Sequence, residues 1–177
     1  SKGSGVSSVG DLLFAATEWL RTTALVDLSL WLSDTPISIF VRDHFYIIPA
    51  LQTAHILSIA TAFGSAIMVN AHILRIGPLY GTLPGTIDRF MPWLWAGLAM
   101  LILSGIGLVI GDPPRELLNA VFWIKMTLVF GIILLSAAVQ LRALRKIDAV
   151  VRLGAVFVIL LWCATIIAGR WIYYVPV

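Results

Sequence analysis

The stretch ALQTAHILSIATAFGSAIMVNAHIL, residues 50–74, decides the fold class because it contains no Asp, Glu, Lys or Arg. A helix rises about 1.5 Å per residue, so this run can cross the roughly 30 Å hydrocarbon core of a bilayer. Three further apolar runs follow, at residues 91–110, 117–141 and 153–173. The sequence therefore predicts a bundle of four transmembrane helices.

The composition of the whole chain indicates the same class. Of the 177 residues, 60% are hydrophobic and 12% are charged, whereas about 25% are charged in an average soluble domain. So short a chain cannot hide that much apolar surface from water. We expect an all-α integral membrane protein whose main partner is the lipid bilayer. Its net charge of +3 is too small to favour nucleic acid.

The residues before the first span predict a surface segment. Residues 1–10 are small and polar, lack the pattern of a signal peptide, and are expected to be disordered. Residues 11–34 are apolar but contain Glu18, Arg21 and Asp27, and a charged side chain is unfavourable at the centre of a bilayer. An N-terminal interfacial amphipathic helix is the expected structure for this stretch.

A short helix is expected to join this segment to the first span. Thr35-Pro36 is typical of a helix start, and Pro49 should kink or restart the helix near residue 48. The predicted organisation is therefore a disordered start, an interfacial helical segment and a four-helix transmembrane domain, at residues 1–10, 11–48 and 49–177.

The connections between the spans carry turn signals and basic residues. Gly and Pro punctuate the first connection from Gly77 to Gly85, and Asp112-Pro113-Pro114 predicts a tight second one. Basic residues flank the first and third connections: Arg75, Arg89, Arg142, Arg145, Lys146 and Arg152. By the positive-inside rule this side faces the cytoplasm. We expect a multi-pass protein of a bacterial inner membrane with both termini in the periplasm.

Small residues within the spans predict close helix packing. Ala60 with Gly64, and Gly107 with Gly111, form pairs four residues apart that let helix backbones approach each other. The glycine-rich second span also offers a surface for association. We expect a homo-oligomer or a subunit of a membrane complex.

Polar residues inside the spans predict a layer at one depth in the outer half of the bilayer. His55 and Lys125 each lie about 10 Å below the outer surface, as judged from the helical rise. The layer draws on all four helices and comprises Gln52, His55, Ser104, Lys125 and Arg170. We predict that these residues bind a small anionic or polar ligand, or a quinone, unless they only bond helices to one another.

Lys125 is the most informative member of this layer. A lysine at that depth either extends toward the surface or faces a partner in the bundle. The predicted spans contain no Asp or Glu. Its partner could be a backbone carbonyl, an anionic ligand, or a carboxylate near the surface, for which the candidates are Asp43, Asp112 and Glu116.

His55 is the candidate ligand of a metal or haem. It could simply bond to Ser104 on the neighbouring helix, or it could ligate the iron of a haem b whose propionates contact Arg42, Lys125 or Arg170. His44 could join it only across a sharp bend. His72 lies about 25 Å away on the same helix and would serve a second haem or an oligomer interface. A copper site is disfavoured because no Met or Cys has a clear spacing to His55.

Four phrases of the sequence occur in a characteristic order: residues 31–75, residues 91–113, NAVFWIKMTL at 119–128 and AGRWIYY at 168–174. Together they resemble a family of small bacterial four-span inner-membrane proteins of unknown function. Asn70 and His72 depart from that family's pattern, which has an acidic residue and an arginine there. The resemblance implies a four-span bundle preceded by an interfacial helix, and it brings no known substrate, reaction or cofactor. The motif carries over onto Pro49, Gln52, His55, Gly64, Pro92, Gly97, Gly105, Lys125 and Arg170.

A looser architectural similarity connects the chain with bacterial membrane bundles that include haem-binding and copper-related members. It rests on a histidine early in the first span followed by a glycine. Three hypotheses follow: a haem b protein in electron transfer or quinone-linked redox; a transporter, channel or ligand-binding subunit; and an accessory or scaffolding subunit. Hydrolytic activity is disfavoured because nucleophile, phosphate-loop and zinc motifs are absent from the sequence.

Overall fold

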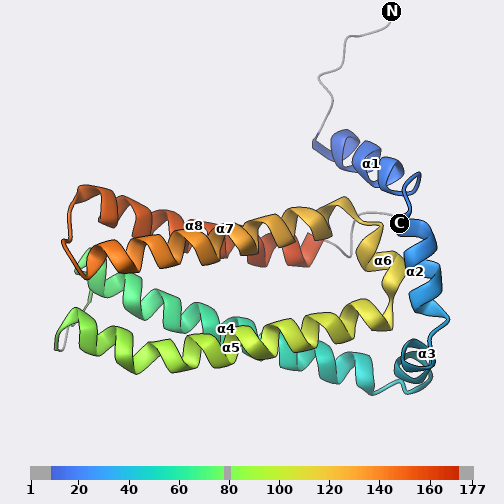
Figure 1. Cartoon of the computed structure of the whole chain (residues 1–177), viewed down its shortest axis with the longest axis horizontal. Helices are drawn as coiled ribbons and strands as arrows, with labels where there is room; N and C mark the ends of the chain where they lie inside the picture. Colours follow the sequence, from blue (N-terminus) through green and yellow to red (C-terminus); the bar gives the residue numbers. More distant parts are fainter. Residues whose placement is uncertain (1–8, 78–80, 172–177) are drawn as a thin grey trace, which may run out of the picture.

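The computed structural model describes residues 9–77 and 81–171, which form helices and contain no strand. Four long helices lie side by side along the molecule (Figure 1). They are α4 (Ile47–Leu74), α5 (Leu83–Gly111), α7 (Ala120–Ala143) and α8 (Ala149–Trp171). All four are long and apolar enough to cross a membrane. The predicted fold class, an all-α membrane bundle with four spanning helices, is confirmed.

The four long helices are arranged as two antiparallel hairpins. Helix α4 packs on α5 and α7 packs on α8, while α4 also contacts α8. Helices α5 and α7 make almost no contact with each other. Figure 1 shows the α4/α5 pair and the α7/α8 pair as two layers. The bundle is therefore held together mainly along the α4–α8 seam.

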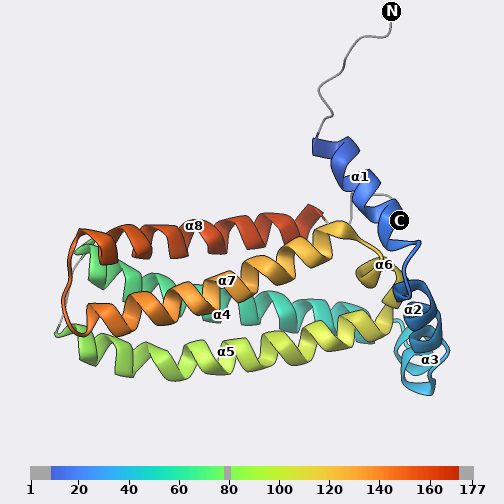
Figure 2. The same ribbon diagram turned by 45° about the horizontal axis from the view of Figure 1, so that its top comes forward.

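Four short helices lie together at one end of the bundle, which we call the α6 end (Figures 1 and 2). Contacts attach α1 to α7, α2 to α6, and α3 to α5. The bounds are α1 (Val9–Leu20), α2 (Leu25–Ser33), α3 (Pro36–Asp43) and α6 (Pro113–Leu117). Of the start predicted to be disordered, residues 1–8 lie outside the described residues, and residues 9 and 10 already belong to α1.

The segment predicted as one interfacial helix forms two. Helix α1 ends at Leu20 because two consecutive threonines turn their hydroxyls back onto the chain. Thr22 donates to the carbonyl of Trp19 at 2.7 Å, and Thr23 donates to that of Leu20 at 2.6 Å. Such local bonds compete with the helical pattern. Pro49 restarts rather than kinks the chain, since α3 ends at Asp43 and Pro49 lies in the first turn of α4.

Two other predicted boundaries also move. Helix α5 begins eight residues before the predicted position 91, because the Thr82 side chain caps it by accepting a bond from the Gly85 amide and Pro84 fits a first turn. Helix α7 begins after Asn119, whose side chain accepts a bond from the Val121 amide at 2.9 Å. The tight turn predicted at Asp112 is followed by the short helix α6.

The apolar core fills the half of the bundle far from α6. Its buried members include Ala62 and Ile73 of α4 and Val151, Ala155 and Val158 of α8. Gly97 allows α4 and α5 to approach closely, since a Cβ there would lie 2.9 Å from the Ala62 amide nitrogen. The other half of the bundle is less well filled, and there the candidate site lies.

Of the two predicted small-residue pairs, one packs closely against other residues and the other is exposed. Gly107 and Gly111 do serve close packing, because a Cβ on either would press on Leu51 or Val41. The prediction for Ala60 and Gly64 is wrong: both are exposed, and a Cβ on Gly64 would meet nothing within 4 Å. Helix α4 turns this pair away from α5.

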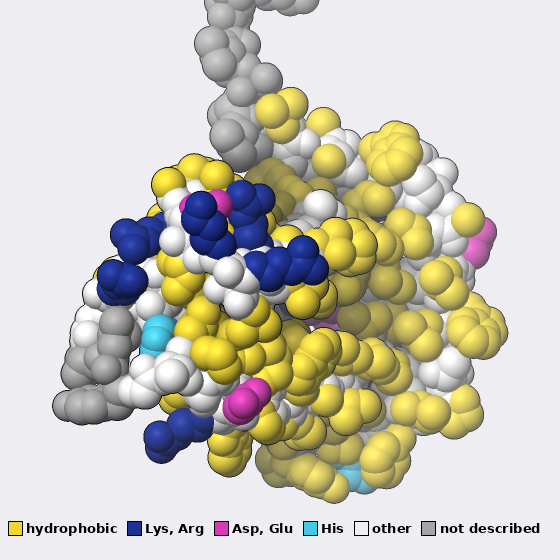
Figure 3. Space-filling view, turned by 60° about the vertical axis from the view of Figure 1, so that its left-hand side comes forward, with side chains coloured by type: hydrophobic (Ala, Val, Ile, Leu, Met, Phe, Trp, Pro, Cys, Tyr) yellow, Lys and Arg dark blue, Asp and Glu magenta, His cyan; other side chains and the backbone are white. Residues whose placement is uncertain are grey.

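Charge is distributed unevenly between the two ends of the bundle. The end opposite α6, which holds the α4–α5 and α7–α8 connections, gathers Lys and Arg side chains, while the sides of the bundle are apolar (Figure 3). One of these residues, Arg142, pairs with Asp148 at 2.8 Å. Hydrogen bonds from Arg142 and from the Val151 amide hold the pKa of the Asp148 carboxyl below its usual value. The basic residues here are Arg75, Arg89, Arg142, Arg145, Lys146 and Arg152.

Candidate functional site

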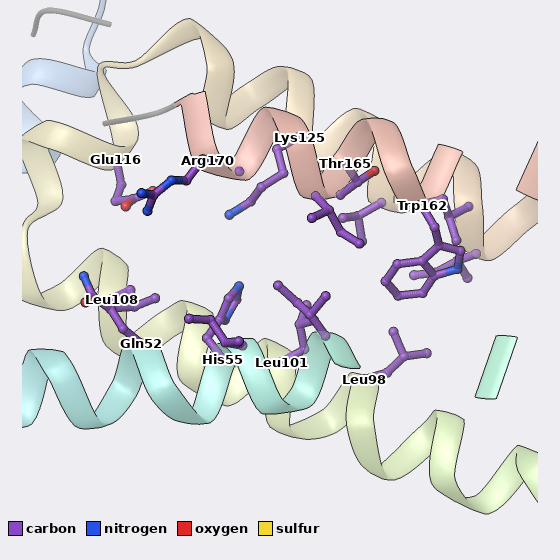
Figure 4. A pocket seen from close by; sticks show the side chains of 17 residues that line it. Gln52, His55, Leu98, Leu101, Leu108, Glu116, Lys125, Trp162, Thr165 and Arg170 are labelled. Carbon is purple, nitrogen blue, oxygen red and sulfur yellow. The ribbon is translucent and has the colours of Figure 1, made fainter. Parts of the chain in front are cut away.

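A cavity of about 470 Å³ lies between the two hairpins, toward the α6 end. This volume is within the usual range for small-molecule sites. Figure 4 shows side chains entering it from α4 and α5 on one side and from α7 and α8 on the other. The residues that line it are Gln52, His55, Ile56, Ile59, Leu98, Leu101, Leu108, Glu116, Lys125, Val129, Ile132, Ile133, Trp162, Thr165, Ile166, Gly169 and Arg170.

The structure brings the predicted polar layer together. Gln52, His55, Lys125 and Arg170 all line the cavity. Ser104 does not line it, and instead hydrogen-bonds to His55 from α5. Residues from four different helices thus meet at one depth, although they are far apart in the sequence.

The His55 ring is fixed by Ser104. Its Nδ1 lies 2.9 Å from the Ser104 hydroxyl oxygen, and that hydroxyl lies 2.6 Å from the carbonyl oxygen of Met100. Serine has one hydroxyl proton, and we assign it to the short bond with Met100. Nδ1 of His55 is then the donor to Ser104. The other ring nitrogen, Nε2, has no partner among the described residues and is left as an acceptor for whatever occupies the cavity.

Lys125 projects into the same cavity from the second turn of α7. Figure 4 shows its side chain reaching toward α4, while the His55 ring reaches toward α7. The stem passes Gly169 of α8, where a Cβ would lie 3.7 Å from the lysine Cδ. The Lys125 Nζ lies 5.8 Å from the centroid of the Phe122 ring, within the range of a cation–π contact. The lysine therefore faces the interior of the bundle.

Glu116 is the acidic member of the site. The sequence offered it as one of three carboxylates that could pair with Lys125, and the structure places Glu116 in the cavity wall. Burial raises the pKa of its carboxyl, Lys125 opposes that rise, Asp112 adds to it and Arg115 opposes it. Glu116 was not predicted as a site residue, because its position depends on α6, which the sequence did not indicate.

The remainder of the cavity wall is apolar. Leu98 and Leu101 line it from α5, Ile132 from α7 and Trp162 from α8 (Figure 4). Thr165 lines it too, but its hydroxyl donates to the Leu161 carbonyl at 2.8 Å. The Trp162 side chain is buried, with 5% of the residue exposed. Polar groups thus lie at the α6 end, and the wall becomes hydrophobic toward the core.

Three predicted cofactor residues lie elsewhere. His44 directly follows α3, and its Nδ1 donates to the Phe40 carbonyl at 2.8 Å. His72 lies at the far end of α4 and bonds the Thr86 hydroxyl at 2.8 Å. Arg42 donates to the carbonyl of Ser33, which fastens α3 to α2. None of the three is in the cavity wall, so the structure does not bring them to His55.

Metal-binding groups are not gathered in the part of the chain that the structure describes, since no three His, Cys, Asp or Glu side chains come together there. Cys163 is exposed on α8 and does not line the cavity. Of the histidines, His55 alone contributes to the described cavity wall. In the described cavity wall, His55 and Glu116 are the side chains of these types, so a metal held here would need further ligands beyond these two.

Fold and cavity together define a multi-pass helical membrane protein with a mixed polar and apolar cavity inside its bundle. Comparisons of the chain with protein-family models, curated proteins and solved structures found no match.

Proposed function

We propose that the chain is a ligand-binding membrane protein, in the manner of a transporter, channel or receptor subunit, that holds a small anionic ligand between Lys125, Arg170 and His55. The observation that carries the proposal is the position of Lys125, a cation within a spanning helix that faces a cavity. Lys125 is the sixth residue of the 24-residue α7, and a charged side chain inside a span is costly unless it reaches the surface or faces the bundle interior. Such residues usually mark a ligand or ion path.

The charges of the site favour an anion. Lys125 and Arg170 contribute two positive charges, and Glu116, when ionised, contributes one negative charge. A ligand with one negative charge would balance the site, and charge-assisted hydrogen bonds to it would be the strongest contacts available. Nε2 of His55 could accept a hydrogen bond from a hydroxyl or amide on the same ligand.

The charge distribution supports an orientation for this proposal. If the end that carries the basic connections lies in the cytoplasm, the cavity lies in the outer leaflet. Both termini then face the periplasm of a bacterium that holds the protein in its inner membrane. Membership of the family that the sequence resembles is part of the same proposal. Single cysteines at two exposed positions in a Cys163→Ser background, Asp34→Cys and Arg145→Cys, test it. A label that cannot cross the membrane should react with Asp34→Cys and not with Arg145→Cys.

Ligand-dependent thermal stability tests the anion site. Acetate, benzoate, phosphate and dodecanoate are added to purified protein, and unfolding temperatures are compared with those of Lys125→Met. At least one anion should stabilise the wild type and not the variant. Met126→Leu is the matched control, because Met126 is exposed on the same turn of α7. Identical responses of wild type and Lys125→Met would refute the assigned site.

A specific observation favours a second candidate, a haem b protein in electron transfer. Histidines that ligate a metal usually donate their other ring N–H to a fixed acceptor, and His55 donates to Ser104 in this way. Lys125 and Arg170 are suited to bind propionates. After expression with haem available, an absorption spectrum with a Soret band that is lost in His55→Ala would favour this candidate. Absence of the band would exclude it.

A further inference from the structure

The cavity is elongated, with its charged groups gathered at one end. Arg170 and Trp162, both on α8, lie eight residues apart, which corresponds to about 12 Å along a helix. Glu116 and Arg170 occupy the α6 end in Figure 4, and Trp162 lies at the opposite end. Between them the wall is built from aliphatic side chains, among them Leu98, Leu101 and Ile132. A compact ion would fill only the charged end.

The cavity also opens through the side of the bundle, between the two hairpins. Helices α5 and α7 hardly touch, although both contribute to its wall. Three aliphatic residues of the wall remain exposed: Ile56 at 64%, Ile133 at 41% and Ile166 at 37%. All three belong to helices that are apolar enough to span a membrane. In a bilayer this opening would face lipid chains rather than water.

We infer that the ligand is a single-chain amphiphile with one negative charge, of the fatty-acid type, which enters from the outer leaflet through the opening between the hairpins. The inference rests on the proposed anion site and adds an aliphatic chain to the ligand. The head group contacts Lys125 and Arg170, and the chain runs along Leu98 and Ile132 toward Trp162. A cavity of about 470 Å³ suits a ligand of drug-like size. A lipid with two chains would leave one of them in the bilayer.

Photo-crosslinking in nanodiscs of zwitterionic lipid tests this assignment. The probe is dodecanoate with a diazirine at the chain end, and the labelled residues are located by mass spectrometry. Labels are expected at Leu98, Ile132 and Trp162 in excess of those at outward-facing Ile102 and Phe130, which are 58% and 64% exposed. Excess unlabelled dodecanoate should remove the labels in the cavity. Acetate and dodecyltrimethylammonium, which lack the chain and the negative charge respectively, should not.

Variants of the lysine separate the possible results. Lys125→Met should reduce labelling in the cavity about tenfold or more, the loss expected for a charge-assisted hydrogen bond. Lys125→Arg should retain most of it, and Met126→Leu should retain all. Lys125→Arg keeps the positive charge. The assignment is therefore supported only if cavity labelling is greater in Lys125→Arg than in Lys125→Met when the two are compared at equal folded fraction. Equal labelling in these two variants would overturn it.

Failure of this inference can be distinguished from failure of the proposed function. If acetate or phosphate stabilises the wild type but not Lys125→Met, and labels lie only on outward-facing residues, the anion site stands and the amphiphile is wrong. If no anion distinguishes the wild type from Lys125→Met and cavity labelling is also unaffected by the variant, both proposals fall.

Discussion

Nδ1 of His55 lies 2.9 Å from the hydroxyl oxygen of Ser104, so a histidine of α4 is bonded to a buried serine of α5. The same hydroxyl lies 2.6 Å from the Met100 carbonyl. With its proton directed there, the serine can only accept from the histidine. The bond thus joins two helices, orients the imidazole and presents Nε2 to the cavity.

Ser104→Ala should release the His55 ring. The variant should unfold about 1 kcal/mol more easily, the net value of one hydrogen bond, and should bind the anionic ligand more weakly. In ¹⁵N NMR of labelled histidine, wild-type His55 should be protonated at Nδ1, and Ser104→Ala should show a mixture of tautomers. Ser104→Thr keeps the hydroxyl and serves as the control. A wild-type His55 protonated only at Nε2 would contradict the assigned tautomer.

Gly97 should be intolerant of a methyl group, whereas Gly64 should accept one. A Cβ on Gly97 would lie 2.9 Å from the backbone nitrogen of Ala62, whereas one on Gly64 would meet nothing within 4 Å. Gly97→Ala should destabilise the bundle by about 1 to 3 kcal/mol through overpacking. Gly64→Ala should be neutral or up to about 1 kcal/mol more stable. Unfolding in mixed micelles measures both, and equal effects would refute the described α4–α5 packing.

Anion binding should strengthen as the pH falls, through the titration of Glu116. Burial raises the pKa of this carboxyl, so lowering the pH through that pKa neutralises a negative charge beside Lys125. An alkyl sulfonate is the suitable probe because its own charge does not change. Glu116→Gln should bind it more tightly at neutral pH and with less dependence on pH.

Other charged or titratable groups act on Glu116 or line the same cavity. Asp112, Arg115 of α6 and Lys125 of α7 act on its carboxyl, and Arg170 of α8 and His55 of α4 line the same cavity. The contribution of Glu116 to the pH dependence of binding is the difference between the pH profiles of binding affinity for wild type and Glu116→Gln. Identical profiles would show that Glu116 does not control the site. Because the pKa of Glu116 is raised in the folded state, its contribution to the free energy of unfolding decreases as the pH rises through that folded-state pKa.

Much of the fold could be predicted from the sequence because a bilayer imposes a simple rule. Runs of about 20 apolar residues must become helices that satisfy their own backbone hydrogen bonds, and all four were confirmed. Boundaries were less predictable because they depend on local hydrogen bonds. Hydrogen bonds of the Thr22 and Thr23 hydroxyls end α1 at Leu20. The Thr82 cap starts α5 at Leu83, eight residues before the predicted start.

The site residues that could be predicted are those whose depth in the membrane is sufficient to place them. Four of the five residues of the polar layer line the cavity, and Ser104 stands behind His55. The spacing of two small residues does not say which face of the helix packs against a neighbour, and Ala60 and Gly64 lie on an exposed face of α4. The place of Glu116 depends on the fold of α6 and could not be found from depth alone.

Equilibrium binding of radiolabelled dodecanoate in nanodiscs tests the central claim, that Lys125 is the cation of a ligand site. We predict saturable binding to the wild type and to Met126→Leu, with affinity reduced about tenfold or more in Lys125→Met. Saturable binding of equal affinity in wild type and Lys125→Met would contradict the claim, whereas binding that is nowhere saturable would contradict the amphiphilic ligand.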